Sequence, residues 1–127
     1  NIDLIVLAGY LSILKGKLLE EYGNRIINIH PSLIPSFCGN KMYGINVHKE
    51  AIEKGVKFSG CTVHFVNDEV DGGAIIAQEI VQVNFEDTPE SLQKKVLDKE
   101  HILLPRIVKY LCEEKIEIHN GKVKILN

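Results

Sequence analysis

Residues 25–35 read Arg-Ile-Ile-Asn-Ile-His-Pro-Ser-Leu-Ile-Pro, a hydrophobic run that carries two polar side chains and continues into a segment with two prolines. The run predicts a buried strand over residues 26–29, and strand periodicity puts Asn28 and His30 on the same face. Pro31 and Pro35 stop regular structure and hold an ordered loop beyond the strand. Because α/β proteins place their ligands where a strand opens into such a loop, we expect the functional site here.

The segment before this stretch predicts a second strand and a helix. Residues 2–8 form a short, continuous apolar run, which is typical of an interior strand. The apolar residues between positions 14 and 22 follow at helical spacing, and a Gly-Asn pair at 23–24 ends that helix. The order strand, helix, strand predicts a right-handed parallel crossover.

The segment after the stretch predicts a loop, a short helix and two strands. Residues 31–44 hold two prolines and two glycines, so we expect an irregular loop. Residues 47–54 predict a short helix that Gly55 closes. Strands are expected over residues 59–66 and 75–83, on either side of the polar, turn-rich residues 67–73.

The last third of the chain predicts a long helix and a hairpin. Thr88 suits the N-cap, Pro89 the first helical position and Glu90 the first turn. An apolar stripe at helical spacing continues to residue 111 through Pro105, so tertiary packing must hold the helix at this proline. Residues 116–125 predict a hairpin with an Asn-Gly turn.

Composition limits the classes of protein that the chain can belong to. Its 127 residues, 45% hydrophobic and 25% charged, suit one globular domain with a modest core. A net charge of −2 argues against nucleic acid as an obligate partner. No apolar stretch reaches the length of a membrane span and no leader opens the chain, so we expect a cytoplasmic protein without a membrane partner.

Three cysteines, Cys38, Cys61 and Cys112, lie far apart and match no zinc spacing. The simplest interpretation is that they are buried or idle thiols in a reducing cytosol. A nucleophilic role remains open for Cys38, because it lies in the loop after His30. The sequence implies no metal.

Asn28, His30 and Asp71 together have the chemistry of an acyl-transfer site. An imidazole titrates near neutral pH, a carboxylate favours its charged form, and an amide donates a fixed hydrogen bond. Such groups stabilise the oxyanion of a tetrahedral intermediate. No serine or cysteine has an obvious base partner, so direct attack by a substrate amine fits best. Plainer interpretations stay open, because His30 could be a structural hydrogen-bonder and Asp71 a turn residue.

Four motifs extend this pattern over nearly the whole chain: residues 7–11, residues 28–35, residues 63–66 with 69–73, and Glu100-His101 followed by Leu104-Pro105. With these motifs the chain resembles the carboxyl-terminal part of the glycinamide ribonucleotide formyltransferase family. The resemblance implies an α/β fold with a mostly parallel, Rossmann-like sheet and flanking helices. It also implies that residues 1–127 form a single formyltransferase domain whose amino-terminal βα units are missing.

The resemblance implies a role for each matching residue. The implied catalytic residues are Asn28, His30 and Asp71. The implied folate-binding residues are Leu11, Ser12, Ile13 and Leu14 around the pteridine, and Asn67, Asp68, Glu69, Val70 and Asp71 in a mobile loop. Gly9 and Glu100 would face the ribonucleotide, with Glu100 near the ribose hydroxyls. His64 would be a near neighbour of the catalytic histidine, or simply a structural strand residue.

Two departures from the family pattern matter. The loop at residues 39–47 is longer than in the shorter family members. The Gly/Ser/Asn-rich loop that holds the substrate phosphate in the family is absent, so we expect an amino-terminally truncated chain. The missing segment would be one partner, and self-association through the exposed edge of the first strand would be another.

The implied reaction is transfer of a formyl group from the co-substrate 10-formyltetrahydrofolate to the amine of glycinamide ribonucleotide, in purine biosynthesis. His30 would protonate the oxyanion, Asn28 would hold the formyl oxygen, and Asp71 would keep His30 cationic. Two alternatives remain. One is a formyltetrahydrofolate hydrolase, in which water replaces the amine; the other is an inactive folate-binding fragment that needs its amino-terminal half.

Overall fold

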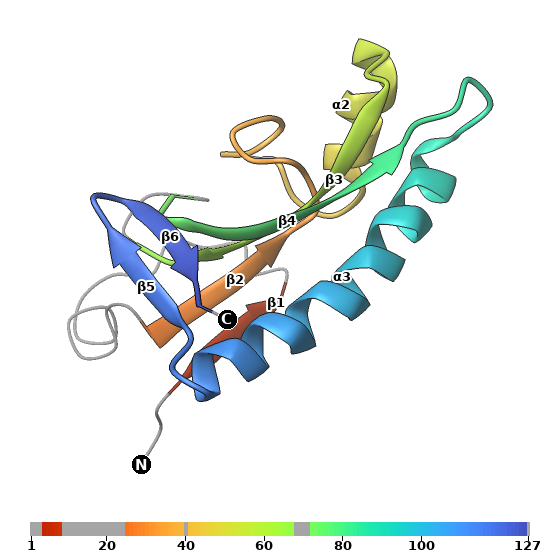
Figure 1. Cartoon of the computed structure of the whole chain (residues 1–127). Helices are drawn as coiled ribbons and strands as arrows, with labels where there is room; N and C mark the ends of the chain where they lie inside the picture. Colours follow the sequence, from red (N-terminus) through yellow and green to blue (C-terminus); the bar gives the residue numbers. More distant parts are fainter. Residues whose placement is uncertain (1–3, 9–24, 40, 68–71, 127) are drawn as a thin grey trace.

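The computed structural model of the chain describes residues 4–8, 25–39, 41–67 and 72–126. Within these residues the strands are β1 (Ile5–Ala8), β2 (Ile26–His30), β3 (Phe58–Phe65), β4 (Ile75–Gln82), β5 (Ile116–His119) and β6 (Lys122–Ile125). The helices are α2 (Ile45–Lys54) and α3 (Pro89–Cys112). The four strands β1 to β4 form one sheet, and β5 and β6 form a separate hairpin (Figure 1).

The sheet confirms the α/β fold but is mixed in the described part of the chain. β1 and β2 are parallel, as predicted, with Ile5 opposite Ile26 and Ala8 opposite Ile29. β2 pairs antiparallel with β3, and β3 pairs antiparallel with β4. The expectation of a mostly parallel sheet is therefore corrected here. Only a short turn-rich segment separates β3 from β4, which suits antiparallel neighbours, whereas a parallel crossover needs a dozen or more residues.

The helix α3 covers one face of this sheet (Figure 1). Side chains of β2 and β3 pack there against the buried stripe of α3; the fully or almost fully buried members are Ile27, Ile29, Cys61, Val63, Leu92, Val96, Leu103 and Ile107. Burying one such aliphatic side chain contributes about 1.5–3 kcal/mol. Because side chains alternate along a strand, Asn28, His30, Thr62 and His64 point to the opposite face.

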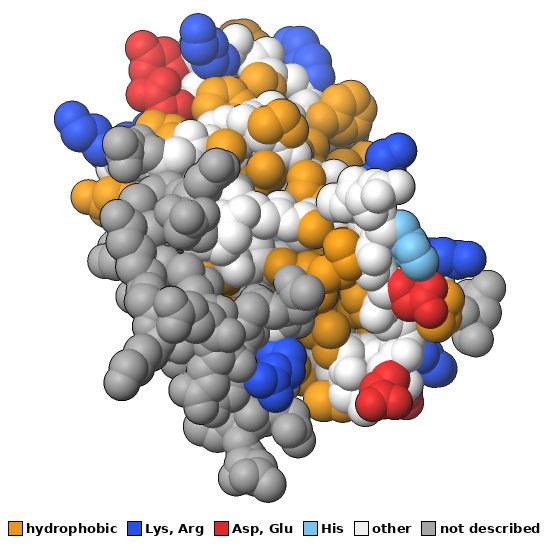
Figure 2. Space-filling model, turned by 90° about the vertical axis from the view of Figure 1, so that its left-hand side faces the viewer, with side chains coloured by type: hydrophobic (Ala, Val, Ile, Leu, Met, Phe, Trp, Pro, Cys, Tyr) orange, Lys and Arg blue, Asp and Glu red, His pale blue; other side chains and the backbone are white. Residues whose placement is uncertain are grey.

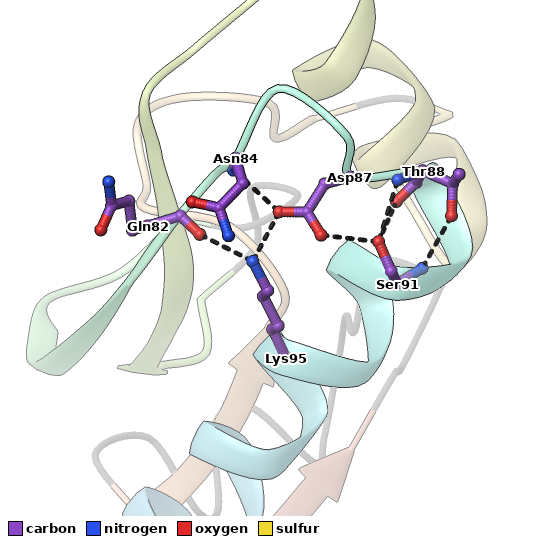
Figure 3. A network of polar contacts seen from close by, with 6 residues as sticks. All are labelled: Gln82, Asn84, Asp87, Thr88, Ser91 and Lys95. Atoms are coloured by element: carbon purple, nitrogen blue, oxygen red, sulfur yellow. Dashed lines mark hydrogen bonds and ion pairs between the residues drawn. The ribbon is translucent and has the colours of Figure 1, made fainter.

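The start of α3 is fixed by a polar network that Figure 3 shows at close range. Thr88 is the N-cap and Pro89 lies in the first turn, as the sequence predicts. Ser91 completes a reciprocal capping box with Thr88, which was not identified from the sequence. The Asp87 carboxylate lies 2.5 Å from Lys95 Nζ and accepts hydrogen bonds from Ser91 Oγ and from the Asn84 backbone N–H. Lys95 also donates to the Gln82 carbonyl, so the network ties α3 to the end of β4.

The other predicted elements also lie close to their predicted positions. α2 begins two residues before the predicted start and ends at Gly55, which has a left-handed φ of 72°. α3 continues through Pro105, with Leu103 and Ile107 buried on either side of it. Asn120 and Gly121 both have positive φ, as the tight hairpin turn requires. The helix predicted between positions 14 and 22 lies outside the described residues.

Figure 2 shows one face of the molecule, where hydrophobic side chains gather near the centre and charged side chains of both signs are scattered around them. Among the described residues on this face, the lysines and arginines do not collect into one patch of the kind that nucleic-acid-binding surfaces carry. Among the described residues, none of the helices combines the length and the apolar character needed to cross a membrane.

Candidate active site

Asn28 and His30 lie at the carboxyl end of β2, on the face of the sheet that α3 does not cover. Their exposed fractions are 5% and 4%, so both polar side chains are removed from bulk water. Ala8, the last residue of β1, pairs with Ile29 between them. The carboxyl end of β1 therefore lies beside the two candidate residues, at the carboxyl ends of parallel strands, where α/β folds place ligands.

The orientation of the Asn28 amide follows from its contact with His64 on β3. These two residues face each other in the strand register, and Asn28 Nδ2 lies 3.4 Å from His64 Nε2. His64 Nδ1 lies 2.8 Å from the Phe65 carbonyl, which can only accept, so Nδ1 carries the proton. In the neutral ring Nε2 is then the acceptor, and the Asn28 amide N–H donates to it. Among the described residues, Asn28 Oδ1 is buried without a hydrogen-bond partner.

The imidazole of His30 is held by the loop that follows β2. Its Nε2 lies 2.9 Å from the Phe37 carbonyl, so this nitrogen carries a proton and donates. Phe37 has a left-handed φ of 50°. Ser32 Oγ donates to the Ser36 carbonyl at 2.5 Å and lies 3.3 Å from the Phe37 carbonyl, so the turn closes on the histidine. The loop is ordered around His30, as its two prolines predict.

Thr62 connects this loop to the sheet and was not identified from the sequence. It pairs with His30 in the register of β2 and β3 and is completely buried. Its hydroxyl donates to the Ser32 carbonyl at 2.7 Å and accepts from the Ile34 N–H at 3.1 Å and from Gln78 Nε2 at 3.0 Å. No local pattern reveals this role, because the register between two distant strands sets it.

His48 on α2 is a second residue that the sequence interpretation missed. It is 1% exposed, and its Nδ1 has no hydrogen-bond partner among the described residues. Burial, with a smaller contribution from the charge of His30, lowers the pKa of His48 to about 4. The ring is therefore neutral near pH 7. Its spacing with Val47 and Ala51, the other buried residues of α2, could have predicted an inward-facing position.

Several predicted site residues lie outside the described part of the chain: Gly9, Leu11, Ser12, Ile13, Leu14, Asp68, Glu69, Val70 and Asp71. The described ends of the 67–73 loop nevertheless have a defined place. The Phe65 N–H donates to the Ala74 carbonyl, and a Cβ on Gly73 would lie 1.9 Å from the Phe65 carbonyl oxygen. Gly73 is thus required by its close approach to the backbone of Phe65, at the end of β3.

The remaining predicted residues, Asn67 and Glu100, lie apart from the Asn28–His30 pair. Asn67 is exposed and follows β3, near the amino end of β2. Glu100 is half-buried on α3, and burial raises the pKa of its carboxyl. Its charge acts on the Cys61 thiol, which points to the α3 side of the sheet. Glu100 and the Asn28–His30 pair therefore occupy opposite faces near the same end of β2.

The three cysteines lie in different environments. Cys61 is buried, and desolvation together with the charge of Glu100 raises its pKa to about 12, so it stays a neutral thiol. Cys38 is half-buried and its Sγ lies 3.3 Å from the Pro35 carbonyl. Cys112 is exposed at the end of α3. In the described segments no three His, Cys, Asp or Glu side chains group as metal ligands would.

Comparison with known proteins shows which family the chain resembles. The formyl transferase family model matches residues 1–108. The chain is 46% identical to the chloroplastic phosphoribosylglycinamide formyltransferase of Arabidopsis thaliana over 126 residues, which is 99% of this chain and 43% of the relative. It is 41% identical to the phosphoribosylglycinamide formyltransferase of Haemophilus influenzae over 120 residues, which is 94% of this chain and 54% of the relative.

Solved structures agree with these relatives. The phosphoribosylglycinamide formyltransferase of Anaplasma phagocytophilum has a TM-score of 0.89 and 43% identity, covering 99% of this chain and 59% of its own. A formyltetrahydrofolate deformylase of Pseudomonas syringae has a TM-score of 0.88 and 36% identity, covering 98% of this chain and 40% of its own. The chain thus spans about half the length of each of these four relatives. On the extent of the family match, the chain belongs to the formyl transferase family.

Proposed function

We propose that this chain belongs to an enzyme that transfers the formyl group of 10-formyltetrahydrofolate to the amine of glycinamide ribonucleotide. The observation that carries the proposal is the buried Asn28–His30 pair at the end of β2. A hydrogen-bond donor and a titratable ring are placed together where a developing oxyanion could be stabilised. The names of the similar proteins from Arabidopsis and Haemophilus support the choice of ribonucleotide as acceptor.

Asn28 would orient the formyl group. One N–H of its amide points to His64 Nε2, which leaves the second N–H to donate to the formyl oxygen. The buried Oδ1 needs a donor, and an N–H of the attacking amine would satisfy it. One amide would thus bind both reactants and hold the nitrogen near the formyl carbon, which lowers the entropic part of the barrier.

His30 would supply the proton. With Nε2 donating to the Phe37 carbonyl, proton exchange with the reacting group falls to Nδ1. A cationic His30 would stabilise the oxyanion, and Asp71 would favour that cation, as a carboxylate partner does. The neutral state of His48 suits this role, because a second cation beside His30 would disfavour its protonation.

The other substrate-binding roles complete the proposal. Leu11 to Leu14 and Asn67 to Asp71 would contact the folate, and Gly9 and Glu100 would contact the ribonucleotide. The enzyme would use no metal and would act on small molecules in the cytoplasm, although the similar proteins of Arabidopsis and Vigna unguiculata are chloroplastic. Imaging of a fluorescently tagged copy of the gene product, with a compartment marker, tests the location.

A second candidate function is hydrolysis of the formyl group, which the likeness to the Pseudomonas syringae deformylase favours. The two functions differ in the acceptor, and the product separates them. The gene-encoded protein is incubated with 10-formyltetrahydrofolate, with and without glycinamide ribonucleotide. Transfer predicts a formylated ribonucleotide and folate turnover that depends on the amine. If formate were released at the same rate in both mixtures, the function would be hydrolysis and not formyl transfer.

A further inference from the structure

Gln78 on β4 makes contacts that its exposed position does not require. A glutamine on the solvent face of a strand ordinarily hydrogen-bonds to water. Here its Nε2 lies 3.1 Å from the Ile34 carbonyl and 3.0 Å from the Thr62 hydroxyl. The amide group thus links β4 to the loop after β2, across a separation of 44 residues.

A continuous set of hydrogen bonds leads from Gln78 to the imidazole of His30. Ile34 is held on both sides, since its carbonyl accepts from Gln78 and its N–H donates to Thr62. Thr62 also holds the Ser32 carbonyl, and Ser32 Oγ in turn reaches the Ser36 and Phe37 carbonyls. The Phe37 carbonyl then accepts from His30 Nε2.

Apolar packing brings the same loop onto the sheet. A Cβ built on Gly60 would lie 2.8 Å from Leu33 Cδ2, so Leu33 lies directly over that glycine. This contact fixes the distance between loop and sheet but has no directional preference. The hydrogen bonds of Gln78 and Thr62 add direction, because a donor must lie near the lone pairs of the carbonyl that it meets.

We propose that Gln78 is a positioning residue for His30. Its amide holds Ile34, and through Ile34 the 31–37 loop, so that the Phe37 carbonyl meets the imidazole at the distance found here. Its importance for turnover rests on the proposed function, whereas its effect on the His30 contact does not. Substitution of Gln78 tests whether this residue and the hydrogen bond between His30 and Phe37 are coupled.

The test uses Gln78→Met in the gene-encoded protein, which keeps the shape of the side chain and removes both N–H donors. Gln82→Met is the matched control, because Gln82 is an exposed glutamine on the same strand and the same face, and its side chain points away from the Lys95 network (Figure 3). Two quantities are measured: solvent exchange of the His30 Nε2–H by NMR, and kcat and KM for both substrates.

We expect Gln78→Met to speed exchange of the His30 Nε2–H about fivefold and to lower kcat about fivefold, the effect of losing one ordinary hydrogen bond, with both KM values within about twofold. Gln82→Met should leave all of these values unchanged. Exchange in Gln78→Met at the wild-type rate, or an equal acceleration in the control, would overturn the inference. Absence of formyl transfer by the wild type would instead refute the proposed function, while the exchange rates still decide the role of Gln78.

Discussion

Three buried histidines lie in this region, and each ring has a different environment. His64 Nδ1 donates a hydrogen bond to the Phe65 carbonyl, and its Nε2 accepts one from Asn28. His30 carries a proton on Nε2, because this nitrogen donates a hydrogen bond to the Phe37 carbonyl. His48 is neutral because its burial disfavours a charge. The lowered pKa of His48 therefore makes it a poor proton donor near neutral pH, whereas the His30 ring is held through Nε2.

Replacing His30 tests its proposed catalytic role. In the gene-encoded protein, His30→Ala should lower kcat by about 10²–10³, as loss of one oxyanion donor does. Folate binding, measured by isothermal titration, should stay close to that of the wild type. A variant that retained more than about half of the wild-type kcat would remove His30 from the proposed mechanism.

His48 makes the stability of the fold depend on pH in a defined window. Its pKa is lowered from 6.5 to about 4, so the unfolded chain binds the proton more readily than the folded one. Stability should therefore fall as pH drops from about 6.5 to 4. Glutamine does not titrate, so in His48→Gln the free energy of unfolding, measured in urea, should fall by on the order of 2 kcal/mol less over this pH range than in the wild type. Equal slopes for the two proteins over this window would contradict the neutral, buried state of His48.

At the scale of single elements, the capping network decides where α3 starts. Asp87 accepts from Lys95, Ser91 and the Asn84 backbone, and these contacts, that of Lys95 foremost, lower its pKa from 3.8 to about 2. The Asp87 side chain is 8% exposed and that of Lys95 34%, so solvent screens part of the attraction. The network stabilises the junction between β4 and α3 in addition to the capping box itself.

Asp87→Asn should destabilise the protein by about 1 kcal/mol at pH 7, because the amide keeps the shape but loses the charge. A carboxylate with a lowered pKa adds to the free energy of unfolding at pH values above 3.8. This stabilisation disappears as the pH falls through about 2. Chemical unfolding at pH 7 and pH 2 measures the difference. Glu86→Gln, at the exposed neighbouring carboxylate, is the control and should be neutral. A penalty for Asp87→Asn that persisted at pH 2 would show that the charge is not the cause.

Gly60 is the point in β3 where a side chain has no room. A Cβ there would lie 2.0 Å from the Glu79 carbonyl oxygen and 2.8 Å from Leu33 Cδ2. Gly60→Ala should therefore destabilise the protein by about 1–3 kcal/mol, as overpacking does, and displace the loop that holds His30. Thermal unfolding measures the loss. Gly55→Ala, where a Cβ meets open space, is the comparison and should lose about 1 kcal/mol from its left-handed backbone alone.

Local signals account for the elements that the sequence predicts well. Thr88-Pro89, Gly55 and Asn120-Gly121 each act within one turn of chain. As these residues predict, α3 begins at Pro89, α2 ends before Gly55, and the hairpin turns at Asn120-Gly121. The alternation of Asn28 and His30 is local as well. The antiparallel pairing of β3 with β2 was missed because no short motif specifies a partner strand, whereas the short connection from β3 to β4 does indicate an antiparallel pair. For the same reason the roles of Thr62 and Gln78 could not be predicted, since each depends on register between distant segments.

At the scale of the whole molecule, one face of the mixed sheet packs against α3 and the other face carries the polar residues of the candidate site. α3 packs on one face and buries the aliphatic side chains that stabilise the fold. The other face gathers Asn28 and His30 from β2, Thr62 and His64 from β3, and Gln78 from β4. The 31–37 loop lies over this second face and is held there by Thr62 and Gln78. The apolar, packed first face thus supports a polar second face whose side chains are oriented by hydrogen bonds.

The most direct test of the central claim is a crystal structure of the gene-encoded protein with glycinamide ribonucleotide and a folate analogue that carries a non-transferable formyl mimic. The account predicts that the carbonyl oxygen of the mimic lies about 3 Å from Asn28 Nδ2 and from His30 Nδ1, with the acceptor amine near Asn28 Oδ1. A mimic bound away from β2, with Asn28 and His30 contacting neither substrate, would contradict it.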